Sequence, residues 1–143
     1  MKRINVFIGF LVFMVVSLSA TSQSGLRTGA EQLEKYLPAL KNKRVAMVAN
    51  RTSVIGNTLV VDSLLSLGIN IVKIFGPEHG FRGTASAGAT VADSVDAKTG
   101  IPEISLYGKK SKPSKEDLNN VDIVVFDIQD VGARFYTYHQ FTC

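Results

Sequence analysis

The sequence predicts an α/β fold: a Rossmann-like, open and mostly parallel sheet with helices on both faces. Short continuous apolar runs alternate with segments of helical spacing, which is typical of crossover units. The runs are apolar throughout, as expected of parallel strands buried on both faces. Polar residues gather just after each run, and sheets of this kind bind ligands beyond the carboxyl ends of their strands.

The first 22 residues have the layout of a secretory signal peptide. Met1–Arg3 is basic, Ile4–Leu18 is almost entirely apolar, and Ala20–Ser22 fits a small-x-small cleavage site. The apolar run is shorter than the roughly 20 residues that span a bilayer. We therefore expect cleavage and export to the periplasm or the extracellular space, with no stable membrane anchor afterwards; a retained anchor is the alternative.

The remaining residues, 23–143, are expected to form one Rossmann-like domain that is incomplete at its C-terminus. Without Lys2 and Arg3, the 16 basic residues fall to 14 against 12 acidic ones, a formal charge of +2. This near-neutral balance argues against nucleic acid as a partner. Cys143 is the single cysteine, so no internal disulfide framework is expected.

Helical spacing of apolar residues predicts most of the helices. They are expected over residues 30–40, 57–68, 114–121 and 132–141. Pro38 limits the first, and Gly68 is placed to end the second. Ser114 and Asp117 form a near capping box at the start of the third.

Apolar runs rich in β-branched residues predict the strands. They are expected at residues 44–50, 69–75 and 121–128, with a weaker strand at 102–108. Because the carboxyl ends of parallel strands meet at one edge of a sheet, the polar residues that follow these runs are candidates for a ligand site. They are Asn50, Arg51, Glu78, His79, Arg82, Tyr107, Asp127, Gln129, Asp130 and Arg134.

Glu78 is the strongest candidate for a catalytic group. A carboxyl group just past a buried strand is partly desolvated, which favours its protonated form and suits a general acid. His79 is placed to orient a substrate or to tune that carboxyl, although adjacent side chains in extended backbone point to opposite faces. The structural alternative is that Glu78 caps a helix and His79 packs in the interior.

The remaining polar candidates have structural alternatives as well. Asp127 and Asp130 suit a base or a sugar-hydroxyl ligand, whereas a strand-ending Asp often bonds backbone N–H groups instead. Arg51, Arg82 and Arg134 would bind an acidic substrate bidentately, unless each forms an ion pair with a nearby carboxylate.

No cofactor is expected. The glycines around Glu78 do not form a Gly-x-Gly-x-x-Gly fingerprint, and no Walker loop is present. The chain has 2 histidines and no His-Glu-x-x-His motif, so a metal site is not indicated either.

Three segments together resemble a known family. "FGPEHGFRG", "TGIPEISLYG" and "VDIVVFDIQDVGARFYTY" are similar, in this order, to signature segments of the exo-β-N-acetylmuramidase family, and they cover roughly Arg44 to Phe141. "VANRTSV" is similar to the family's first strand-end loop, less distinctively. The resemblance implies a Rossmann-like catalytic domain followed by a smaller C-terminal domain, so the chain would be the N-terminal part of a longer protein.

The resemblance also implies an activity and its residues. Family members are glycoside hydrolases that release N-acetylmuramic acid from the non-reducing end of peptidoglycan fragments, without metal or nucleotide. Their catalytic glutamate corresponds to Glu78, and the neighbouring histidine to His79. Asp130 is the further catalytic candidate. We expect Asn50, Arg51, Arg82, Tyr107, Asp127, Gln129 and Arg134 to bind substrate.

Two other functions fit the same residues. One is a non-catalytic sugar- or peptidoglycan-binding protein that kept the pocket. The other is an exported hydrolase of a different acidic substrate on the same fold. The sequence does not distinguish retention from inversion, and it leaves the oligomeric state open.

Overall fold

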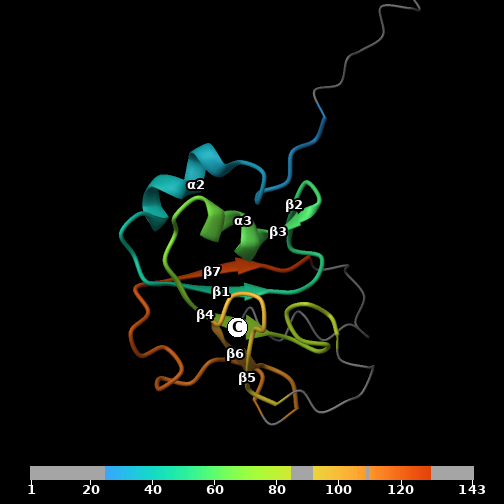
Figure 1. Ribbon diagram of the computed structural model, residues 1–143, viewed down its shortest axis with the longest axis vertical. Coiled ribbons are helices and arrows are strands. Elements are labelled where there is room, and N and C mark those ends of the chain that lie inside the picture. Colours follow the sequence, from blue (N-terminus) through green and yellow to red (C-terminus); the bar gives the residue numbers. More distant parts are fainter. Residues whose placement is uncertain (1–24, 85–91, 109, 130–143) are drawn as a thin grey trace, which may run out of the picture.

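The computed structural model describes residues 25–84, 92–108 and 110–129 (Figure 1). The expected signal peptide and the helix expected over 132–141 lie outside the described residues. The elements of the described part are α2 (Leu33–Leu40), β1 (Val45–Ala49), β2 (Val54–Ile55), β3 (Thr58–Leu59), α3 (Val60–Ser66), β4 (Ile71–Gly76), β5 (Ser94–Val95), β6 (Pro102–Ser105) and β7 (Ile123–Asp127).

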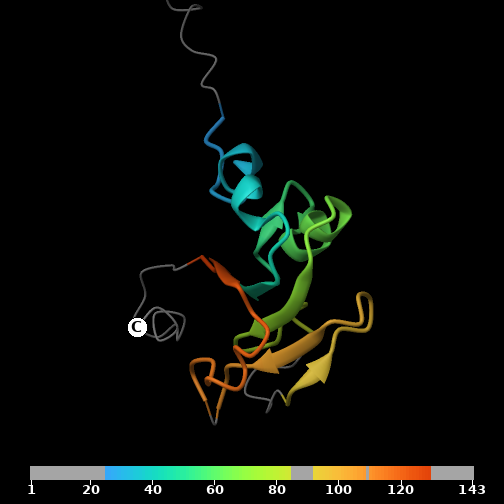
Figure 2. The same ribbon diagram turned by 90° about the vertical axis from the view of Figure 1, so that its left-hand side faces the viewer.

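The main sheet has the strand order β5-β6-β4-β1-β7. Strands β6, β4, β1 and β7 are mutually parallel, and the short β5 runs antiparallel to β6. Figure 2 shows β6 and β5 extending the sheet away from α2 and α3. The expected α/β class with a mostly parallel sheet is confirmed.

The register aligns the carboxyl ends of the four parallel strands. Ala49 of β1 lies opposite Asp127 of β7, and Val48 lies opposite Phe75 of β4. Gly76, the last residue of β4, lies opposite Ser105 of β6. The loops that follow these strands therefore leave the sheet at one edge.

The larger hydrophobic core lies between the sheet and the two helices. Val45, Met47 and Ala49 of β1 are fully buried there against residues of both helices, such as Leu40 and Leu64. Both described helices thus cover the same face, as Figure 1 also shows. Helices on both faces were expected, and the helix predicted over 132–141 lies outside the described residues.

The opposite face carries a smaller core. Ala46, Val48, Phe75 and Leu106 are buried in it. Strands β1 and β4 are therefore apolar on both sides, which explains why their sequences are continuous apolar runs and not alternating ones.

The prediction of a helix over residues 114–121 is wrong, because the structure has turns there. The capping interaction is present, since Ser114 N–H donates to Asp117 at 2.9 Å and Asp117 N–H donates to the Ser114 hydroxyl at 3.2 Å. Mainly i→i+3 turns follow, and Asn120 takes a left-handed φ of 63°. The Lys73 ammonium binds the Asp117 carbonyl, which also draws the turn toward the sheet.

The expected helix over 57–68 is shorter, because its first residues form a hairpin. Residues 58–59 pair with 54–55 as strands β3 and β2, and α3 begins at Val60. Gly68 ends the helix as expected, with a φ of 78° and its N–H donating to the Leu65 carbonyl at 2.9 Å. In the described part of the chain, no helix is long and apolar enough to cross a bilayer.

Candidate active site

The predicted polar residues that the structure describes all lie at the edge of the sheet where the parallel strands have their carboxyl ends. Asn50 and Arg51 follow β1, and Glu78, His79 and Arg82 follow β4. The remaining described candidates, after or at the end of β6 and β7, are Tyr107, Asp127 and Gln129. Asp130 and Arg134 lie outside the described residues.

Glu78 and Tyr107 come together from neighbouring strands. Both follow parallel strands that pair directly, β4 and β6. The negative charge of Glu78, and then a hydrogen bond to its side chain, raise the pKa of the Tyr107 hydroxyl above its ordinary value. The phenol therefore stays protonated beside the Glu78 carboxylate.

The loop that carries Glu78 is a tight double turn. Gly80 N–H donates to the Pro77 carbonyl at 2.9 Å, and Gly83 N–H donates to the Gly80 carbonyl at 3.3 Å. His79 adopts a φ of 74°, a left-handed conformation that is uncommon outside glycine and concentrates at functional sites. The backbone thus turns sharply between Glu78 and His79, and the extended-backbone reasoning for this pair does not apply.

Glu103 is not among the site residues predicted from the sequence, although its side chain holds this loop. It lies on β6, is 9% exposed, and accepts the Phe81 N–H at 2.6 Å through Oε1. A Cβ on Gly76 would come within 2.6 Å of the same oxygen, so glycine is required there. The available signal was an acidic residue inside an apolar strand, "PEIS".

Arg82 is held in a carboxylate cluster. Its NH2 group lies 3.0 Å from Asp62 Oδ1 and 2.8 Å from Asp96 Oδ2, and its Nε bonds Asp96 Oδ1. Hydrogen bonds to Asp96 and then Asp62 raise the pKa of Arg82, and the Arg82 bond lowers the pKa of Asp96 to about 2. The ion-pair alternative therefore describes Arg82 in this structure, with the guanidinium also lying over the Phe81 ring at 4.9 Å.

Arg51 is exposed and has a different environment. Its aliphatic stem packs on Gly83, where an ideal Cβ would approach Arg51 Cδ to 2.7 Å. With its stem held there, the guanidinium forms no hydrogen bond or ion pair with the described part of the chain. Of the two described arginines at this edge, Arg51 is the one whose charge faces solvent.

Asn50 shapes the loop after β1. It is 5% exposed, and its side-chain oxygen accepts the Thr52 N–H at 3.0 Å and the Thr52 hydroxyl at 2.7 Å. Its own N–H donates to the Ser53 hydroxyl at 3.0 Å, and that hydroxyl in turn bonds the Asp127 carbonyl. These bonds connect the loop after β1 to the end of β7.

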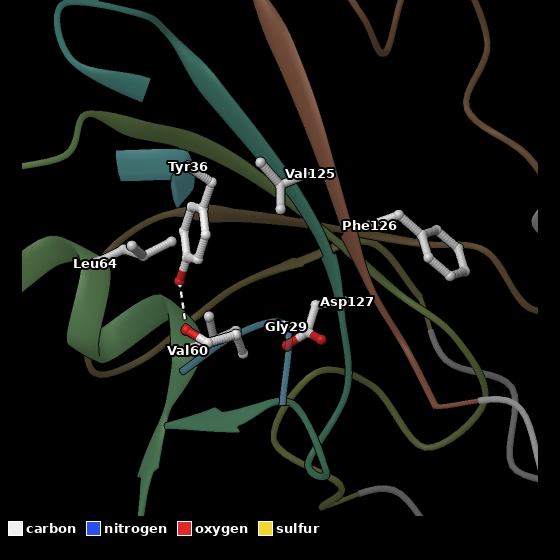
Figure 3. A pocket seen from close by; sticks show the side chains of 8 residues that line it. Gly29, Tyr36, Val60, Leu64, Val125, Phe126 and Asp127 are labelled. Carbon is white, nitrogen blue, oxygen red and sulfur yellow. Dashed lines mark hydrogen bonds between the residues drawn. The ribbon is translucent and has the colours of Figure 1, made fainter. Parts of the chain in front are cut away.

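Asp127 ends β7 with a buried carboxyl oxygen. Its Oδ2 accepts no hydrogen bond within the described structure, and desolvation raises the pKa of the carboxyl group. Figure 3 shows the Asp127 side chain pointing into a cavity beside Gly29 and Val60, whereas Phe126 points away. Within residues 25–84, 92–108 and 110–129, no backbone N–H bonds this side chain, so the strand-ending alternative finds no support there.

Two adjoining hollows meet at Asp127. One, of about 210 Å³, is lined largely by apolar groups of Tyr36, Val60, Leu64 and Val125. The other, of about 310 Å³, has a mixed polar and apolar lining from the segment before α2 and the ends of β1 and β7, namely Thr28, Ala30, Thr52, Ser53, Val54, Asp127, Ile128 and Gln129. No three His, Cys, Asp or Glu side chains within the described ranges gather as a metal-binding group would.

Fold and site together define a class of protein. The domain is a mostly parallel α/β unit whose strand-end loops present a carboxyl group beside a tyrosine, a second, partly buried carboxyl group and an exposed arginine. Carboxyl groups of differing environment beside a cation suit acid–base chemistry on an anionic, polar substrate.

The particular family follows from sequence comparison. The family model described as "Exo-beta-N-acetylmuramidase NamZ, N-terminal" matches residues 45–142, more than half of the chain, and the chain belongs to this family. It is 41% identical over 152 residues to the peptidoglycan beta-N-acetylmuramidase NamZ of Bacillus subtilis (strain 168). That match covers 96% of this chain and 36% of the relative, so the chain spans about a third of the relative's length.

Two solved structures from Bacteroides fragilis NCTC 9343 are similar. Both are crystal structures of DUF1343 family proteins, at 1.30 Å and 1.65 Å resolution. They share 48% and 41% identity with this chain at TM-scores of 0.64 and 0.68. Each comparison covers 78% of this chain and 28% of the solved chain.

Proposed function

We propose that the protein carrying this chain is an exo-acting glycoside hydrolase that releases terminal N-acetylmuramic acid from the non-reducing end of peptidoglycan fragments. The observation that carries the proposal is the position of Glu78, which follows β4 at the carboxyl edge of the sheet, near Tyr107 of the loop after the neighbouring strand β6. Family membership and the 41% identity to a peptidoglycan beta-N-acetylmuramidase supply the substrate class.

Glu78 is proposed as the general acid. In hydrolysis the bond between the anomeric carbon and the leaving oxygen breaks, and Glu78 gives its proton to that oxygen. Water supplies the hydroxyl group that the anomeric carbon gains, and the remaining proton of the water passes to a carboxylate of the site. The Tyr107 hydroxyl orients the Glu78 carboxyl group. His79, which follows Glu78 at the sharp backbone turn, is proposed to contact the substrate.

A second carboxyl group is needed for the water or the oxocarbenium-like transition state. Asp127 and Asp130 are the candidates, and Asp127 is described. Strands β7 and β4 are separated by β1, so their backbones lie about 10 Å apart at spacings of about 4.8 Å. That separation leaves room for a pyranose ring between Glu78 and Asp127.

Arg51 is proposed to bind the lactyl carboxylate that distinguishes muramic acid from glucosamine. Its guanidinium is solvent-facing, and its stem is packed on the loop that carries Glu78. Arg82, in contrast, uses its donors on Asp62 and Asp96. Of the two described arginines, we therefore propose Arg51 for the carboxylate-binding role, while Arg134 lies outside the described residues.

Turnover of a chromogenic β-glycoside of N-acetylmuramic acid tests the catalytic proposal. Glu78→Gln should reduce kcat by at least about 10²-fold, the usual contribution of a general acid, while binding persists. Glu116→Gln is the matched control, since Glu116 is an exposed carboxylate in the turns that precede β7, at the opposite edge. Equal turnover by Glu78→Gln and wild type would refute the assignment.

The same measurement separates the two other functions. A sugar-binding protein without catalysis would bind the fragments and release no sugar in wild type as well as in Glu78→Gln. A hydrolase of another acidic substrate would leave the muramic acid glycoside intact and cleave a different glycoside or ester.

Substrate selectivity tests the role of Arg51. Wild type should hydrolyse the N-acetylmuramic acid glycoside far faster than the N-acetylglucosamine glycoside, and Arg51→Gln should narrow that ratio by about tenfold or more, the effect of losing a charged hydrogen bond. Arg44→Gln is the control, because Arg44 pairs with Asp122 at the opposite edge. An unchanged ratio in Arg51→Gln would exclude this arginine.

We further propose that the protein is exported, with residues 1–22 removed as a signal peptide. The layout of the first 22 residues and the extracytoplasmic position of peptidoglycan support this. N-terminal sequencing of protein from the periplasm or medium should begin at Gln23. Recovery in the cytoplasm with Met1 retained would contradict it.

A further inference from the structure

Arg82 connects three segments of the chain that lie far apart in the sequence. Its guanidinium donates two hydrogen bonds to Asp62 on α3 and two to Asp96 in the turn between β5 and β6. These bonds use most of the N–H donors that an arginine side chain has. We call Asp62, Arg82 and Asp96 together the Arg82 bridge.

The surrounding fold fixes both carboxylates of the bridge. Asp62 lies in the first turn of α3 beside Val61, which is fully buried in the core. Asp96 is 4% exposed, and it accepts the Thr99 N–H at 3.0 Å and the Thr99 hydroxyl at 2.6 Å. Ile101 of the same turn is buried in the core that α3 also lines. The bridge therefore holds Arg82 between two elements that the core keeps in place.

The chain between Arg82 and Glu78 is short and closed by hydrogen bonds. A backbone hydrogen bond of 2.9 Å joins the two ends of the turn at 77–80, which contains Glu78. The next residue, Phe81, is fully buried, donates its N–H to Glu103 and has the guanidinium 4.9 Å from the centre of its ring. Because these contacts leave the segment little backbone freedom, a shift of Arg82 moves Glu78 as well.

We propose that Asp62 and Asp96 are positioning residues for the hydrolysis: through Arg82 they hold the loop that carries Glu78 where this acid reaches the leaving oxygen. The inference rests on the proposed function for the reaction. It makes Arg82 an anchor of the loop in place of the substrate-binding residue expected from the sequence. Misplacing a catalytic group by about 1 Å costs about 10²-fold in rate, so the bridge should act mainly on kcat.

Three substitutions separate the geometry of the bridge from its charge. Arg82→Lys keeps the positive charge, but one ammonium group does not reproduce two bidentate pairs. Asp62→Asn keeps the size of the side chain and removes a charge that faces Arg82. Lys98→Gln is the matched control, since Lys98 donates to Asp62 at 2.7 Å, has a side chain that is 63% exposed and belongs to the turn after β5 and not to the loop.

The test compares kcat and KM of the protein carrying this chain on a chromogenic β-glycoside of N-acetylmuramic acid. Arg82→Lys and Asp62→Asn should each lower kcat by about tenfold or more with little change in KM, and Lys98→Gln should match wild type. The double variant should lose no more than the more severe single variant, because both substitutions break the same bridge. A wild-type kcat in either single variant, or effects that multiply in the double variant, would overturn the proposal.

A second substrate distinguishes an anchor from a substrate-binding arginine. The glycoside of N-acetylglucosamine lacks the lactyl carboxylate, so an anchor predicts that Arg82→Lys lowers kcat/KM for both glycosides by the same factor. A larger loss for the N-acetylmuramic acid glycoside would assign Arg82 to the substrate and overturn the proposal.

Ile69→Val shows whether a lower kcat is only a consequence of lower stability. Ile69 is 4% exposed and precedes β4, away from the strand-end edge, so the smaller side chain destabilises the core without touching the bridge. At a temperature where urea denaturation shows every variant folded, Ile69→Val should keep the wild-type kcat and the bridge variants should not. Equal kcat values for Ile69→Val and the bridge variants would overturn the positioning role.

Hydrogen exchange at the loop amides keeps this proposal separate from the proposed function. In Asp62→Asn the Gly80 and Phe81 amides should exchange about tenfold faster than in wild type, whereas the Met47 amide of β1 should follow global stability. If wild type cleaves neither glycoside, the proposed hydrolase fails, and the exchange rates then decide whether the bridge holds the loop. Faster exchange at the two loop amides supports it, and unchanged exchange overturns it.

Discussion

Replacing Asp96 by Asn tests whether Arg82 has a structural role. Asp96 is 4% exposed and receives two hydrogen bonds from Arg82 and two from Thr99. Asn preserves the size of the side chain and can still accept the Thr99 N–H. The substitution therefore removes mainly the charge that faces Arg82.

The size of the effect follows from the pKa of Asp96. Hydrogen bonds from Arg82, the largest cause, lower that pKa from 3.8 to about 2. At about 1.4 kcal/mol per pKa unit, the ionised form contributes about 2 kcal/mol to folding. A carboxyl group with a depressed pKa in the folded state stabilises above its unfolded pKa, and this contribution is lost as the pH falls through about 2.

Urea denaturation at a series of pH values measures the effect. Asp96→Asn should lower the free energy of unfolding by about 2 kcal/mol at pH 7, and the difference from wild type should shrink between about pH 4 and pH 2. Asp122→Asn is the comparison, since the Arg44–Asp122 pair is exposed and should give a smaller, salt-sensitive loss. A loss for Asp96→Asn that is the same at pH 7 and pH 2 would refute the linkage argument.

Three further outcomes are expected. Glu103→Ala should lower kcat by about tenfold or more with little change in KM, because the Phe81 N–H loses its acceptor and the loop that carries Glu78 shifts. Glu103→Gln keeps an acceptor oxygen and should retain most activity. Equal kcat values for the two variants would contradict this prediction. Glu78→Gln should lower the pKa of Tyr107, because the substitution removes the negative charge that raises it. In an ultraviolet absorbance titration, phenolate should then form at a lower alkaline pH than in wild type. The same absorbance change should be missing in Tyr107→Phe. Burial raises the pKa of Asp127 in the folded state, so the unfolded chain releases this proton first and wild type loses stability as the pH rises above about 4. Asp127→Asn cannot titrate and should not show this loss. Identical pH profiles of the two proteins in urea denaturation would contradict the prediction.

The two central strands, β1 and β4, were predictable because they are buried on both faces. Residues 45–49 and 71–76 show this most clearly, as short β-branched or small apolar runs with polar residues at their ends. The segment 114–121 was mispredicted because its capping residues are present while the backbone after them is set by tertiary contacts. Capping bonds are local and visible in sequence, whereas the contact from Lys73 to the Asp117 carbonyl spans 44 residues.

The sequence predicted the location of the candidate site better than it predicted the contacts of the individual residues. The rule that ligands bind beyond parallel strand ends located Glu78 and Tyr107 at one edge, and the structure pairs them. The rule does not predict which carboxylates form ion pairs with an arginine at this edge. Arg82 turns to Asp62, which lies on α3 and 20 residues away in the chain, and spacing alone does not reveal that contact. Glu103 was overlooked because it stands inside a strand and not after one.

The carboxyl groups near this edge differ through their partners. Asp62 and Asp96 are satisfied by Arg82, so they stabilise the fold and have little capacity left for a substrate. Glu103 accepts a backbone N–H and holds the loop above it. Glu78 faces a phenol, and Asp127 has a buried oxygen without a partner in the described structure. Since a carboxyl group that is not fully used within the fold is the one that a substrate can still bind, Glu78 and Asp127 are the acids for which we propose a part in the reaction, although the sequence presents all of these residues as equivalent acids.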